Sequence, residues 1–161
     1  MKKYMLSIFV VTITTVATWA NNTTPSTPTP YEMTIKMLTL KAGTLVFLEL
    51  DEKLYSDEVS IGKSVRFKVR TNVMAEGKVV ITTGSLAIGR VKNIKAPTYN
   101  NPAEVTIELT YVQAVDGQQV ALNGTEQIVK GQFPSQGTEI NAGTSITANV
   151  MNDIDIEVKN N

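Results

Sequence analysis

The sequence predicts an all-β mature domain with little or no helix. We expect a single antiparallel β-barrel, closed or partly open, with a β-sandwich as the alternative. Apolar and polar residues alternate strictly over residues 65–70 and again over 105–111, which is typical of strands with one buried face. Glycine-containing turns separate the apolar runs, and Gly89 interrupts one of them, which indicates a bulge that curls the sheet. Bent strands joined by short turns favour a barrel or a sandwich.

The first thirty residues are expected to lie outside this domain. Met1-Lys2-Lys3 is a short basic segment, an apolar stretch follows, and Ala17-Thr18-Trp19-Ala20 offers small residues for cleavage after Ala20. This layout predicts a secretory signal peptide over residues 1–20, with an uncleaved N-terminal anchor as the alternative. Residues 21–30 (NNTTPSTPTP) contain no apolar residue and predict a flexible Thr/Pro-rich tether. Residues 31–161 then form a single β-domain.

The signal peptide predicts export to the periplasm, to the outer membrane or out of the cell. The chain has no Cys, so we expect no lipid modification of the lipoprotein kind. No second long apolar segment follows, so no transmembrane span is expected in the mature chain. The chain also has no His, which removes the commonest general base and the commonest transition-metal ligand.

The first part of the domain is predicted to contain two strands and a connector. Alternation from Met33 to Met37 predicts the first strand, and the phase of the apolar residues shifts at Leu38. Residues 44–50 predict the second strand. Residues 51–60 lack a helical stripe, so we expect an irregular segment or one short turn.

Residues 62–91 predict a three-stranded meander. Its first strand, residues 65–70, should bury its three apolar side chains and expose its three basic ones. The segment Ala75-Glu76-Gly77-Lys78 predicts a turn, because Gly77 can adopt positive φ. The return strand follows at residues 79–81, and the third strand covers residues 86–91.

The rest of the domain is predicted as a loop, a strand, a type I′ hairpin turn, a second loop and two final strands. These segments are residues 95–102, 105–111, Asp116-Gly117, 128–139, 145–150 and 154–158. A Gly-Ser/Thr step recurs at Gly43, Gly84 and Gly143, each followed by an apolar residue seven positions later. This recurrence indicates either a duplicated β-unit or one turn type used three times.

Positive charge is concentrated in one segment. Eight basic residues and one acid lie between Ile61 and Lys95, whereas eight acids and two lysines follow from Ala96 to the end. On one interpretation the basic strand face, Arg66, Lys68 and Arg70, pairs across strands with Glu104 and Glu108. On the other, these three residues form a ligand-binding face for an anionic glycan or lipid. Nucleic acid is not expected as a partner, because aromatic residues are not interleaved with the basic ones.

A second candidate site is acidic. Asp153, Asp155 and Glu157 alternate with apolar residues, so in a strand they share one face, where carboxylate oxygens can bind Ca²⁺. The alternative is a solvated face on an edge strand, where charge discourages pairing with other chains. No cofactor is expected.

The segment from Lys41 to Leu122 resembles the C-terminal β-barrel of the TrbI family, the envelope-spanning scaffold and channel proteins of type IV secretion and conjugation machines. The similar stretches are AGTLVFLEL, Ser56, GKSVRFKVRTNVMAEGKVVITTGSLAIGRV and VTIELTYVQAVDGQQVAL. Thr83 stands where the family usually has a proline, and the family's helical antenna insertion is not evident. The resemblance implies a β-barrel envelope domain and carries over no functional residue.

The sequence therefore predicts a non-catalytic, exported cell-envelope β-domain that acts by protein–protein interaction or as an assembly part. The alternative function is a binding module for anionic glycan or lipid through the basic strand face. A carboxylate-dependent hydrolase ranks last, because no pair of carboxylates is singled out and no serine has a histidine partner.

Overall fold

The computed structural model describes residues 34–123, 126–130 and 139–160. The predicted signal peptide (1–20), the tether (21–30) and Met33 lie outside the described residues. Within the described part every regular element is a strand, which confirms the all-β prediction, and no helix there is long and apolar enough to cross a membrane. The strands are β1 (Thr34–Leu40), β2 (Leu45–Leu50), β3 (Leu54–Tyr55), β4 (Ser64–Val69), β5 (Val73–Ala75), β6 (Lys78–Ile81), β7 (Leu86–Lys95), β8 (Glu104–Gln113), β9 (Gln119–Ala121), β10 (Glu126–Lys130), β11 (Glu139–Ile140), β12 (Ser145–Asn149) and β13 (Ile154–Asn160).

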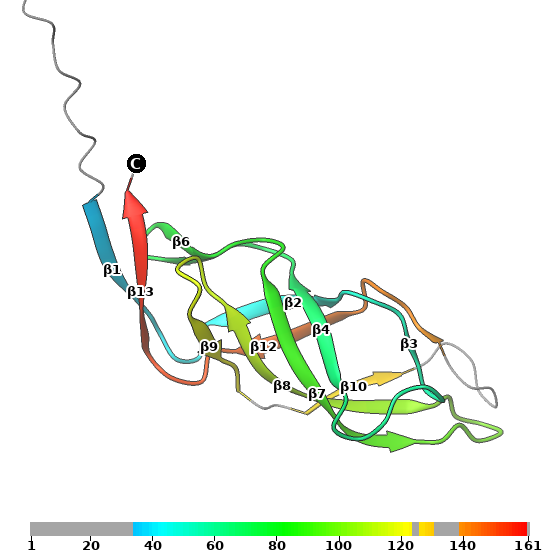
Figure 1. Cartoon of the computed structure of the whole chain (residues 1–161). Helices are drawn as coiled ribbons and strands as arrows, with labels where there is room; N and C mark the ends of the chain where they lie inside the picture. The colour runs from blue at the N-terminus through cyan, green and yellow to red at the C-terminus, as the bar shows by residue number, and fades with distance from the viewer. Residues whose placement is uncertain (1–33, 124–125, 131–138, 161) are drawn as a thin grey trace, which may run out of the picture. The chain divides into compact units, whose positions relative to one another are not determined.

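The main sheet is antiparallel and curls into a partly open barrel (Figure 1). Its strand order is β10-β8-β7-β4-β2-β12, and β9 also pairs with β8. The residues after β9 and β12 meet in the bridge Leu122↔Val150. Two backbone hydrogen bonds flank this bridge: Asn123 N–H donates to the Asn149 carbonyl at 2.6 Å, and Met151 N–H donates to the Ala121 carbonyl at 2.9 Å. The barrel is therefore closed at the β9 end, whereas β10 has no described strand partner except β8.

The core lies inside this curled sheet and follows the predicted alternation. In β4 the apolar side chains Val65, Phe67 and Val69 are buried, while Arg66 and Lys68 are exposed. β8 buries Val105, Ile107 and Leu109 as predicted, but Thr106 is buried as well, and beyond Leu109 the buried residue is Val112 and not Tyr111. The predicted alternation is thus confirmed in β4 and in part of β8.

Gly89 marks the bend of the sheet, as predicted. The register between β7 and β8 shifts between Ile88 and Gly89, which is a β-bulge. A Cβ atom at Gly89 would lie 2.8 Å from Ile107 Cγ2 and 3.1 Å from both Phe67 Cε2 and the Glu108 carbonyl oxygen. Only glycine therefore lets the two strands and the Phe67 ring approach this closely.

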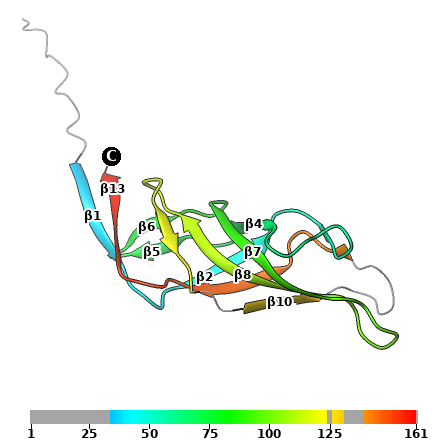
Figure 2. The ribbon, with the colours of Figure 1, turned by 60° about the horizontal axis from the view of Figure 1, so that its bottom comes forward.

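The predicted three-stranded meander over residues 62–91 is wrong. The turn at Glu76-Gly77 is present, with φ values of 47° and 76°, but β5 and β6 form a separate two-stranded hairpin (Figure 2). β4 pairs directly with β7 instead. Gly84 N–H donates to the Val69 carbonyl at 2.8 Å, so the turn before β7 returns the chain to the end of β4. The hairpin is an excursion between two strands that are neighbours in the sheet.

Four glycine turns share one backbone arrangement. Gly43, which precedes β2, donates its N–H to the carbonyl of Val150 just after β12, and Gly143, which precedes β12, donates its N–H to the carbonyl of Leu50 at the end of β2, both at 2.8 Å. Gly62 and Gly84 do the same toward Val91 and Val69, also at 2.8 Å. The β2–β12 and β4–β7 pairs therefore have the same hydrogen-bond arrangement, in which the glycine before each strand binds the partner strand at the end of the paired stretch. The recurrence has a fourth member at Gly62, which lacks the hydroxyl residue that marks the other three.

β1 and β13 form a two-stranded antiparallel ribbon outside the main sheet (Figure 1). Leu38, Leu40 and Ile156 are buried on one face of the ribbon, where β1 contacts β5 and β13 contacts β6. The two final strands, residues 145–150 and 154–158, are confirmed as predicted, within a residue or two.

Two connectors contain more structure than predicted. In the expected irregular segment 51–60, the short strand β3 pairs with β11. The expected loop over residues 128–139 contains the end of β10 and the start of β11, and its middle lies outside the described residues. Both pairings are made with strands distant in sequence, so local composition could not predict them. The Asp116-Gly117 turn is present, but only Gly117 has positive φ (87°), so it is not type I′.

Candidate functional site

The basic strand face predicted at Arg66, Lys68 and Arg70 lies on the solvent side of β4. Each of its three cations has an acidic partner. Lys68 Nζ contacts the Asp51 carboxylate, and Arg66 Nη2 lies 3.6 Å from Asp51 Oδ2. Arg70 Nε lies 3.6 Å from Glu49 Oε2, and its Nη1 donates to Ser145 Oγ at 2.7 Å.

The predicted acidic partners, Glu104 and Glu108, are wrong. β7 lies between β4 and β8, so side chains on β8 do not face those on β4. Glu104 accepts hydrogen bonds from Lys95 at 3.0 Å and pairs with Lys130 at 3.1 Å. The hydrogen bonds from these two lysines hold the pKa of Glu104 below its ordinary value.

The acids that do face β4 come from the end of β2. Glu49 lies opposite Lys68 in the ladder, and Asp51 follows the strand directly. The Asp51 side chain is only 13% exposed, so its attraction to the cations is less screened than that of a fully exposed pair. Three cations and two acids leave this face with little net charge. An anionic ligand would have to displace Asp51 or Glu49 to bind the guanidinium groups fully.

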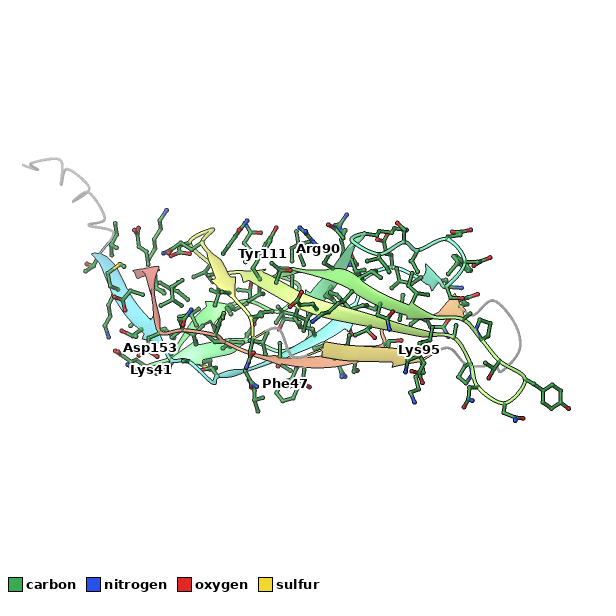
Figure 3. The ribbon with its side chains drawn as sticks, turned by 90° about the horizontal axis from the view of Figure 1, so that it is seen from below. Lys41, Phe47, Arg90, Lys95, Tyr111 and Asp153 are labelled. Atoms are coloured by element: carbon green, nitrogen blue, oxygen red, sulfur yellow. The ribbon has the colours of Figure 1, made fainter. Side chains whose placement is uncertain are left out.

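The acidic candidate does not form a single cluster. Asp153 Oδ1 accepts a hydrogen bond from Ala42 N–H and Asp153 Oδ2 one from Lys41 Nζ, both at 2.8 Å (Figure 3). The Lys41 hydrogen bond, with that of Ala42, lowers the pKa of Asp153, and the same contact raises the pKa of Lys41. Asp155 accepts from Thr39 Oγ1 at 2.6 Å. The described residues contain no group of three or more carboxylates placed to hold one metal ion.

These contacts fasten the β1–β13 ribbon, and one of its edges is covered. Asp116, in the turn between β8 and β9, accepts the N–H of Glu157 at 2.9 Å. Gln118 Nε2 donates to the Asp155 carbonyl at 3.2 Å. Of the backbone groups that β13 directs away from β1, the Glu157 N–H and the Asp155 carbonyl are therefore bound by side chains of this turn. These side chains lie where a further strand would otherwise pair.

On the other edge of the ribbon no described strand is paired. Because Asp155 and Glu157 direct their backbone groups outward, their cross-strand neighbours Thr39 and Met37 do the same on β1. Ile35 follows the same period. Among the described residues, β1 has no strand partner except β13. We call this the β1 edge, defined by Ile35, Met37 and Thr39.

The β1 edge carries two large apolar side chains in solvent. Ile35 and Met37 are each 55% exposed, while Leu38 and Leu40 on the opposite face are buried. The strand is thus apolar on both faces. The sequence signal for this was the phase shift at Leu38, which a strand with a single buried face would not show. Sequence reasoning noted the shift but did not identify the edge.

No protein-family model matches this chain, and no characterised protein matches it at a significant level.

Proposed function

We propose that this chain is a non-catalytic β-domain of the cell envelope that acts by protein–protein contact, as an assembly or structural part. The single observation that supports this is the β1 edge. An unpaired strand offers a row of N–H and C=O groups to which another chain's strand can add. Ile35 and Met37 provide exposed apolar area beside that row. Placement in the envelope rests on the predicted signal peptide and on the resemblance to the TrbI barrels.

The contrast between the two ribbon edges strengthens the proposal. Proteins commonly blunt exposed strand edges with charged side chains, prolines or covering loops. Here the β13 edge is covered by Asp116 and Gln118. The residues of the β1 edge carry no charge, and the single charge of β1, Lys36, points its side chain to the other face and pairs with Glu76 at 3.0 Å. An edge left open beside a covered one is the arrangement expected of a binding surface.

Site-specific photocrosslinking in expressing cells tests the proposal. A benzophenone amino acid at Met37 should give a protein adduct, whether with a further copy or another protein. Met151 is the matched control, because it is also a methionine, with 57% of its surface exposed, and it lies beside Leu122 and Thr110, away from the β1 edge. Adduct yield at Met37 no higher than at Met151 would contradict the proposal.

The alternative function, binding of an anionic glycan or lipid, is favoured by the three cations on the outer face of β4. Reversal of Arg66, Lys68 and Arg70 to glutamate should then weaken binding to envelope fractions, and binding of the unaltered chain should fall with salt. Binding that is unchanged by the three reversals would remove this alternative.

A further inference from the structure

We infer that the partner at the β1 edge is a second copy of this chain, bound so that the two β1 strands pair antiparallel about Met37. This inference rests on the proposed function, because it names the partner of the same surface. It follows from the register that the edge permits, from the charges along β1 and from the covered edge of β13.

The register follows from the backbone. Ile35, Met37 and Thr39 direct their N–H and C=O groups outward, so a strand that adds here must bond through these three residues. A two-fold axis through Met37 places Met37 opposite Met37 of the second copy, and Ile35 opposite the second copy's Thr39. All three outward residues are then used in both copies. The surface is self-complementary, as a two-fold interface requires.

Charge disfavours the neighbouring register, with its axis through Lys36. Lys36 is the only charged residue of β1. An axis through Lys36 would place its ammonium group directly opposite itself, and like charges across a strand pair are destabilising. The axis through Met37 instead places Lys36 opposite the second copy's Leu38. No like charges then face each other between the paired strands.

The apolar side chains fit the same arrangement. Ile35 and Met37 lie on the face that β5 and β6 do not cover, next to Glu157 and Lys159 of β13. Pairing about Met37 brings Ile35 and Met37 of both copies into one stripe of four apolar side chains. Within this stripe the two Met37 side chains lie directly opposite each other, and apolar cross-strand pairs stabilise sheets.

The covered edge limits the assembly to two copies. Pairing would give a four-stranded sheet in which β13 of each copy is outermost. At each β13 edge the Glu157 N–H and the Asp155 carbonyl are already bound by Asp116 and Gln118 of the same chain, so a further strand cannot form a continuous ladder there. We therefore expect a dimer closed by its two-fold axis and not a fibre. A single strand pair is a small interface, and interfaces below about 1,200 Å² are typical of weak complexes, so the dimer should depend on concentration.

Single cysteines test the register, because the full chain contains none. Outward residues opposite each other have Cα atoms about 5.5 Å apart, which is within the range of a disulfide. Met37→Cys should therefore form a covalent dimer under mild oxidation. Met74→Cys, at equal exposure, should remain monomeric, and Lys36→Cys should cross-link much more slowly because it does not face itself. Equal oxidation rates at the three positions would overturn the inference.

Sedimentation of the full chain tests the dimer without any cross-linking. We expect a monomer–dimer equilibrium that Met37→Lys abolishes, because it opposes two ammonium groups, and that Met74→Lys leaves unchanged. A monomer at every concentration would also overturn the inference. If the chain is monomeric while Met37 still cross-links to another protein in cells, the proposed function survives and only the second copy is wrong. If both experiments fail, neither proposal stands.

Discussion

Gly89 shows how one missing side chain sets the curvature of the sheet. At this position β7 and β8 shift register and the ring of Phe67 packs against the backbone. Three neighbouring atoms lie within 3.1 Å of the place that a Cβ atom would take. The neighbours belong to the core and the backbone, so they cannot move aside freely.

Gly89→Ala should destabilise the domain by about 1–3 kcal/mol, since a methyl group is forced into a packed interior. Urea unfolding measures this loss. Phe67→Leu removes the ring atom that the new methyl group meets, so the double variant should lose less stability than the two single variants together. Strictly additive losses would show that the Phe67 ring does not restrict this position.

Glu76 is the only described residue other than glycine with positive φ. It begins the β5–β6 turn and pairs with Lys36, but both side chains are more than half exposed, so the ion pair contributes little. Glu76→Gln removes the charge and keeps the unfavourable conformation, whereas Glu76→Asn removes the charge and suits that conformation. Thermal unfolding should find the Asn variant more stable than the Gln variant by roughly 1 kcal/mol. Equal stabilities would mean that the turn is not under strain.

At the scale of elements, the Asp116 carboxylate binds the edge of β13 that faces away from β1. Burial opposes the ionisation of Asp116, but hydrogen bonds from Gln118 N–H, Glu157 N–H and the Gln118 amide outweigh it, so the pKa of Asp116 is lowered. Asp116→Ala should destabilise the domain at pH 7 by about 1.5–3 kcal/mol, the range for a hydrogen bond to a charged group. Urea unfolding of both proteins gives this difference.

The stabilisation by Asp116 should depend on pH in a defined direction. Because its folded pKa lies below that of the unfolded chain, about 3.9, the full stabilisation is present above that pH. It is lost as the pH falls further, through the folded pKa. The stability difference between the unaltered chain and Asp116→Ala should therefore shrink below about pH 4. Asp57→Ala, at an exposed turn position, controls for the loss of any aspartate. A difference that stays constant down to pH 2 would contradict this account.

Strands were predictable from sequence where one face is buried and the other is wet. Val65, Phe67 and Val69 show this in β4, because a period of two identifies the buried face without knowledge of the neighbouring strands. The same pattern placed Arg66 and Arg70 on the solvent face correctly. Alternation is a property of a single strand, and a single strand is what a short stretch of sequence describes.

The pairing of strands could not be predicted in the same way. The acids opposite β4 are Glu49 and Asp51 and not Glu104, because β2 and β7 are its neighbours. The β5–β6 hairpin interrupts the chain between two paired strands, so closeness in sequence predicted the wrong neighbour. The β1 edge was also missed, because whether a strand has an open side depends on which other strands are present.

At the scale of the whole described domain, the first and last strands are paired. Thr34 lies opposite Asn160, so the two ends of the domain are adjacent in the ribbon. The far turn between β7 and β8 is exposed and carries no core residue at its tip, where Tyr99 is 89% exposed. Chains with adjacent ends and an exposed loop commonly tolerate new termini.

A circular permutant should therefore fold. Asn160 is joined to Thr34 through an Asn-Gly turn, the preceding segment is omitted, and the chain opens between Tyr99 and Asn100. The ribbon then becomes a hairpin closed by a short turn, which favours its pairing, while the core of the barrel is unchanged. We expect the circular dichroism of a β-domain and a stability within about 2 kcal/mol of the parent, since the cut removes no core contact. As a control, opening the chain at Gly89, inside the packed bend, should prevent folding. A permutant opened at Tyr99 that does not fold would show that the β7–β8 turn, or the segment before Thr34, is needed to form the barrel.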